Sequence, residues 1–105
     1  MGYVISEYLV LQNMANELKR NITNLIMASE DLSMKNRIEL VRGLDVKVIN
    51  SSVVVSSLFP GKFFALNNGS PTFNKPFNWI ERAMGISHIN TDKVVVDALM
   101  STGVR

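Results

Sequence analysis

The chain has 105 residues, which suffices for one domain with a modest core, so we expect a single domain over residues 1–105. Apolar residues make up 47% of the chain, which excludes wholesale disorder, and no apolar run reaches the roughly 20 residues that a membrane span needs. The net charge is only +2 and the 11 basic residues are scattered, which argues against a dedicated nucleic-acid-binding protein.

The N-terminal part of the chain predicts two amphipathic helices. Apolar residues between positions 11 and 25 recur every three or four residues, which places them on one face of a helix from about Ser6 to Ser29. Ser6 is the expected N-cap of this helix. A second, shorter helix should follow, with Ser33 as its N-cap and Gly43 ending it in the left-handed conformation.

Beyond Gly43 the periodicity changes to that of β-structure. Apolar and polar residues alternate from Leu44 to Val48, and the β-branched run Val53–Val55 favours a second strand. A Pro60-Gly61 turn precedes a third segment, Phe63–Leu66, that we expect to be extended. These segments together predict an antiparallel three-stranded meander over residues 44–67.

The C-terminal part predicts one helix and a tail with two possible structures. Pro76 suits the first turn of a helix that Gly85 would end. In the tail, Val94–Val96 favours a strand, whereas Thr91 as a cap and residues 97–100 favour a helix, and we expect a short helix. The predicted fold class is therefore α+β, with N-terminal amphipathic helices, the meander, and a C-terminal helix or helices. The side chains expected to be largely buried are Leu11, Leu18, Ile22, Val46, Val48, Phe64 and Trp79.

No residue pattern typical of an enzyme or a metal site is present. The single histidine, His88, has no evident catalytic partner in the sequence, and there is no cysteine. The acidic residues lack the spacing of a calcium-binding loop, and no phosphate-binding or nucleophile motif occurs. We therefore predict no catalytic residue, no cofactor, no metal and no small-molecule substrate.

The loop between residues 67 and 77 is the best candidate for an interface. Phe73 and Phe77 lie in a segment that is otherwise suited to solvent, and aromatic residues commonly anchor protein interfaces. The polar positions Asn67, Asn68 and Ser70 precede them. The simpler alternative is that most aromatic residues belong to the core. Because two lysines are close in sequence, stacking on single-stranded nucleic acid is a further alternative.

Three features follow one another between Phe63 and Met84. An aromatic-Ala pair, Phe64-Ala65, lies in the expected third strand, Gly69-Ser70 follows it, and Pro76-Phe77 opens a helix. This order resembles the tail-completion and head–tail joining (neck) proteins of long-tailed bacteriophages, although Asn67 stands where that family usually has an acidic residue. The resemblance implies a ring-forming structural protein of the virion, assembled in the host cytoplasm, that contacts itself and neighbouring virion proteins without a cofactor. A small phage-type regulatory or inhibitory protein that binds a host protein or nucleic acid is the alternative.

Overall fold

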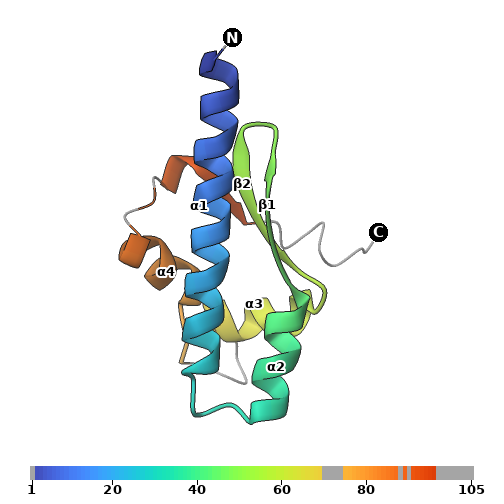
Figure 1. Cartoon of the computed structure of the whole chain (residues 1–105). Helices are drawn as coiled ribbons and strands as arrows, with labels where there is room; N and C mark the ends of the chain where they lie inside the picture. Colours follow the sequence, from blue (N-terminus) through green and yellow to red (C-terminus); the bar gives the residue numbers. More distant parts are fainter. Residues whose placement is uncertain (1, 70–74, 88, 90, 97–105) are drawn as a thin grey trace.

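The computed structural model describes residues 2–69, 75–87, 89 and 91–96, and within these it shows an α+β fold (Figure 1). A long helix runs the length of the molecule, with the sheet packed on one part of its surface and a short C-terminal helix on another. The elements in chain order are α1 (Gly2–Met27), α2 (Met34–Gly43), β1 (Leu44–Ile49), β2 (Ser52–Ser57), α3 (Pro60–Asn68), α4 (Trp79–Ser87), a 3-10 turn η1 (Thr91–Lys93) and β3 (Val94–Val96).

Helix α1 is the central element of the fold, because α2, α4, β1 and β2 all contact it. Its buried face follows the three- and four-residue spacing of the sequence and consists of Leu11, Ala15, Leu18, Ile22 and Ile26. The predicted helix is confirmed, but its predicted start is wrong. The helix begins at Gly2, so Ser6 lies inside it and is not the N-cap.

Helix α2 is confirmed with its predicted cap, since the Ser33 hydroxyl accepts a hydrogen bond of 3.2 Å from the backbone N–H of Asn36. The predicted left-handed conformation of Gly43 is wrong. Gly43 is the last residue of α2, and the chain continues directly into β1 with Leu44 in an extended conformation. The glycine is required for another reason: a Cβ at this position would lie 2.7 Å from Cδ2 of Phe59.

The sheet has three strands in the order β1-β2-β3. Strands β1 and β2 form the predicted antiparallel hairpin, and its turn residues Asn50 and Ser51 both have positive φ angles, 49° and 62°, as in a type I′ turn. The third strand is not the predicted one. Val94–Val96 pairs with β2 in parallel, so the sheet is mixed and the antiparallel meander is wrong. The prediction of a short helix in the tail is also wrong for Val94–Val96.

The segment Phe63–Leu66, predicted to be a strand, belongs to helix α3. Pro60 lies at the first position of that helix, where its missing N–H removes no hydrogen bond. The residues that α3 buries, Phe63, Phe64 and Asn67, share one helical face by their spacing. A strand would have separated Phe63 and Phe64 onto opposite sides, whereas the helix packs both rings inward with their centroids 4.9 Å apart.

Helix α4 was predicted in the right region but with wrong ends. It begins at Trp79, not at Pro76, and it continues through Gly85 to Ser87. Two backbone hydrogen bonds of 3.0 Å hold the preceding residues against α3: the N–H groups of Phe77 and Asn78 donate to the carbonyls of Leu66 and Asn67. These bonds account for the later start of the helix.

The core contains most of the side chains that were expected there. Six of the seven are buried, and Val48 is only partly buried. Trp79 is fully buried, and its indole N–H donates a 2.9 Å hydrogen bond to the hydroxyl of Ser29 at the end of α1. This hydrogen bond therefore offsets the cost of burying the polar N–H of the indole ring.

Candidate interaction surfaces

The candidate interface loop is partly built into the fold. Asn67 is only 1% exposed, and its side-chain carbonyl accepts a 3.2 Å hydrogen bond from the backbone N–H of Ile80 near the start of α4. Phe77 is half-buried and stacks on Trp79 with 4.8 Å between ring centroids. Asn68 is exposed, and Ser70 and Phe73 lie outside the described residues. Asn67 is thus not available to a partner, and the interface role of the other positions stays a prediction.

The described residues do not assemble a recognisable metal site. No group of three histidine, cysteine, aspartate or glutamate side chains lies close enough together to hold a metal ion within the described parts of the chain. His88 falls outside those parts. None of the described helices is both long and apolar enough to cross a membrane.

The first exposed apolar surface lies at the N-terminal end of α1. Tyr8, Leu9 and Val10 are 54%, 53% and 57% exposed, although all three are large and apolar. Figure 1 shows the first turns of α1 extending past the β1–β2 turn, beyond the sheet that covers the helix further along. Successive helical residues are about 100° apart, so these three side chains surround more than half of the helix. We call Tyr8, Leu9 and Val10 the N-terminal apolar surface.

The sequence contains a sign of this surface in the run Tyr8-Leu9-Val10-Leu11. The buried face of α1 begins at Leu11, and three consecutive apolar residues cannot all point the same way. Tyr8 lies three residues before Leu11, on the side of the helix that is buried further along, whereas Leu9 and Val10 point elsewhere. Exposed apolar side chains that lie together commonly mark a contact with another molecule.

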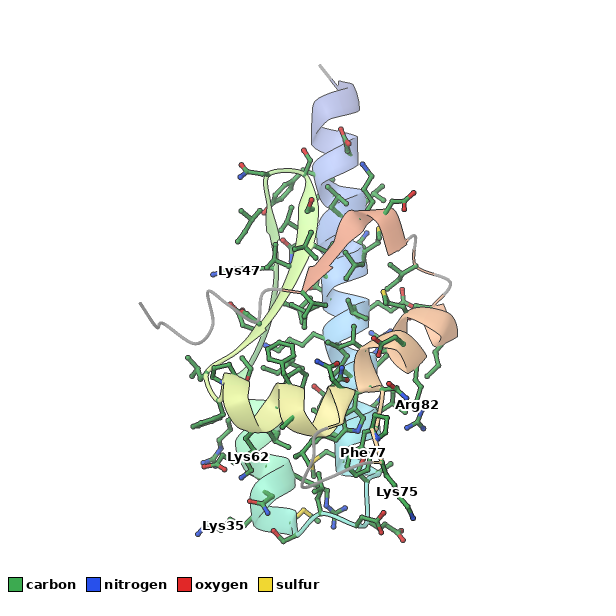
Figure 2. All side chains as sticks on the ribbon, turned by 180° about the vertical axis from the view of Figure 1, so that it is seen from behind. Lys35, Lys47, Lys62, Lys75, Phe77 and Arg82 are labelled. Carbon is green, nitrogen blue, oxygen red and sulfur yellow. The ribbon has the colours of Figure 1, made fainter. Side chains whose placement is uncertain are left out.

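The second surface is an open hollow of about 540 Å³ beside α2 and the start of α3, lined by Lys35, Ile38, Glu39, Arg42 and Phe59. We call these five residues the basic hollow. Figure 2 shows Lys35 and Lys62 at this end of the molecule, away from Lys47 on the sheet. Leu58, which is 76% exposed, precedes Phe59 in the chain and lies near Gly43. The hollow thus combines apolar side chains with charged ones.

A polar cluster fixes one wall of the basic hollow. The ammonium group of Lys62 lies 2.5 Å from a carboxylate oxygen of Glu39 and donates a 2.6 Å hydrogen bond to the side-chain carbonyl of Asn36. The hydrogen bond from Lys62 and its positive charge lower the pKa of Glu39 below the ordinary value of 4.5, with a smaller contribution from Lys35. Glu39 is therefore ionised at neutral pH, and its charge is already compensated by Lys62.

Comparison of the chain with protein-family models, with curated proteins and with solved structures finds no match. Its function must accordingly be argued from the two surfaces and from the sequence.

Proposed function

We propose that the chain is a structural subunit that works by binding copies of itself and neighbouring proteins, and not by catalysis. The observation that supports this proposal is the N-terminal apolar surface, where three consecutive large apolar residues are each more than half exposed. Exposed apolar groups that lie together on a protein commonly mark an interaction site. Burial of these side chains against another copy would stabilise an oligomer by the hydrophobic effect.

The form of assembly that we propose is a ring at the head–tail junction of a tailed bacteriophage. A contact between two different patches of the same subunit closes a ring when it is repeated about an axis. In such a ring, each subunit would bind the N-terminal apolar surface of its neighbour through a different patch. The phage assignment rests on the order of residues from Phe63 to Met84. The fold does not add to it, because the Phe64-Ala65 pair lies on a helix instead of the expected strand.

Mass spectrometry of purified virions from the source of this chain tests the proposed function. The expected result is that its peptides are present in intact particles, in several copies per particle and in amounts comparable with other proteins of the neck. If the chain is abundant in infected cells but absent from washed particles, the structural role is wrong. The alternative of a small regulatory protein that binds a host protein or nucleic acid would then be preferred.

A further inference from the structure

The basic hollow carries an excess of positive charge. Glu39 is compensated by Lys62, whereas Lys35 and Arg42 have no ion-pair partner among the residues that the structure describes. Both side chains are exposed, and they are on α2 at the rim of the hollow. An occupant with carboxylate groups would therefore meet a net positive charge, because Lys35, Arg42 and Lys62 outnumber Glu39.

The spacing of the two positive charges sets the geometry of that occupant. Lys35 and Arg42 are seven residues apart on one helix, which corresponds to about 10 Å along its axis at 1.5 Å per residue. Ile38 lies between them, and Phe59 forms the opposite wall. In a peptide with the polyproline II conformation, residues three apart lie on the same side and span about 9 Å at 3.1 Å per residue. Two carboxylates at this spacing could contact both cations while an apolar side chain between them enters the hollow.

We infer that the basic hollow binds an acidic peptide segment of a partner protein, in which two acidic residues three positions apart flank a large apolar residue. This binding goes beyond the proposed self-assembly, since it uses α2 and the start of α3 and leaves the N-terminal apolar surface uncovered. The charge of the hollow selects the acidic groups, and its apolar walls select the side chain between them.

The composition of the hollow favours a peptide over a nucleic acid. A nucleic acid would present its phosphates to a row of basic side chains and its bases to several aromatic rings. Here there are only two uncompensated cations, a carboxylate lines the same surface, and Phe59 is the single aromatic residue of the lining. The apolar side chains of Ile38 and Phe59 suit an aliphatic or aromatic side chain of a peptide.

Selection from a random peptide library displayed on messenger RNA tests this inference with the full chain as bait. We expect enriched peptides to carry two Asp or Glu residues three apart with Leu, Ile or Phe between them. The affinity of a synthetic peptide of that sequence should fall by up to about fivefold in Lys35→Gln and in Arg42→Gln, as for single exposed ion pairs. The double charge reversal Lys35→Glu and Arg42→Glu should weaken binding by roughly tenfold or more.

A matched control removes one positive charge elsewhere. Lys47→Gln, on the exposed side of the sheet in Figure 2, should leave peptide affinity unchanged. The single Gln variants should melt close to the wild-type temperature, whereas the double charge reversal should melt somewhat lower because it places like charges on α2. The inference fails if the library yields no acidic peptide, or if the enriched peptides bind the double charge-reversal variant as tightly as the wild type. It also fails if a single-stranded DNA oligonucleotide binds the hollow more tightly than the selected peptide. None of these results depends on whether the protein forms a ring.

Discussion

Gly43 and Phe59 are in close contact at the junction of α2 and β1. The ring of Phe59 covers the glycine so closely that a methyl group there would lie 2.7 Å and 2.9 Å from two ring carbons. The neighbouring backbone is also fixed, because the N–H of Leu58 donates a 2.9 Å hydrogen bond to the carbonyl of Gly43. The side chain of Phe59 would have to rotate outward to make room for a Cβ.

We therefore expect Gly43→Ala to lower the free energy of unfolding by about 1–3 kcal/mol, as overpacking commonly does. In a Phe59→Ala background the same substitution should cost little, because the obstructing ring is gone and alanine is favoured in helices. Gly85→Ala in α4 is the matched control, since a Cβ there meets nothing within 4 Å, and it should stabilise by about 0.5–1 kcal/mol. Denaturant unfolding measures the stability of Gly43→Ala, Phe59→Ala, the double variant and Gly85→Ala. If Gly43→Ala costs the same in the wild type as in the Phe59→Ala background, the contact between Gly43 and the Phe59 ring is disproved.

The ion pair between Lys62 and Glu39 predicts a pH-dependent stability. The pKa of Glu39 is lowered in the folded protein, so ionisation of this carboxyl stabilises the fold. This contribution is present above the unfolded-state pKa and is lost as the pH falls through the folded-state pKa. We expect Glu39→Gln to melt at a lower temperature than the wild type at neutral pH, with the difference shrinking in acid.

Thermal melts recorded across the acidic range, with Glu30→Gln in the α1–α2 loop as a control for loss of an exposed carboxylate, measure this effect. The effect should be small, because an exposed ion pair contributes little in water. A difference between Glu39→Gln and the wild type that persists unchanged in acid would show that the ion pair is not its cause.

At the scale of elements, Asn67 joins α3 to α4. Its side-chain carbonyl accepts the N–H of Ile80 in the first turn of α4, and its side-chain amide donates a 2.8 Å hydrogen bond to the side chain of Asn68. The first turn of a helix has N–H groups without partners inside the helix, so this bond acts as a cap from a distant part of the chain. Because Asn67 is buried, these two hydrogen bonds are needed to satisfy its polar side chain.

Asn67→Ala should lower the free energy of unfolding by about 1–3 kcal/mol, because it leaves the buried N–H of Ile80 without an acceptor. Asn67→Asp keeps an acceptor oxygen, but it buries a carboxylate at a position that is 1% exposed and removes the donor to Asn68, so it should also be destabilising. Asn24→Ala, on the exposed side of α1, controls for loss of an amide and should change little. Chemical denaturation distinguishes these variants, and a neutral Asn67→Ala would contradict the capping role.

The elements that could be predicted from the sequence are those specified by local patterns. In each of these elements, a few neighbouring residues are enough to indicate the structure. The patterns are the apolar spacing of α1, the Ser33 cap of α2 and the alternation of apolar and polar residues in β1. The turn at Asn50 and Ser51 lies between the two segments that were predicted to be strands. These features need no knowledge of distant contacts.

The errors fall where distant residues decide the structure. Phe63–Leu66 is a short apolar run that suits either a strand or a helix, and the helix is selected by packing of two phenylalanine rings inward and by Asn67 binding α4. Val94–Val96 is a strand because β2 offers a free edge, which a single sequence does not reveal. The N-terminal apolar surface was missed because its exposure depends on where the sheet ends along α1.

At the scale of the whole molecule, the two surfaces lie on different parts of the fold. The N-terminal apolar surface lies in the N-terminal third of α1, whereas the basic hollow lies beside α2 and the start of α3, which are at the other end of the molecule (Figures 1 and 2). A subunit bound to its own copies through one end could therefore still bind a partner through the other. This separation is consistent with a protein that connects different components of an assembly.

The molar mass of the purified protein in solution, measured by light scattering over a range of concentrations, is the most direct test of the central claim. We expect a closed oligomer for the wild type, a monomer for the double variant Leu9→Glu and Val10→Glu, and equal melting behaviour of the two chains at low concentration. Ile86→Glu is the matched control, because Ile86 on α4 is 59% exposed and should leave the oligomer intact. A wild-type protein that stays monomeric at every concentration, or a double variant that keeps the mass of the oligomer, would contradict assembly through the N-terminal apolar surface.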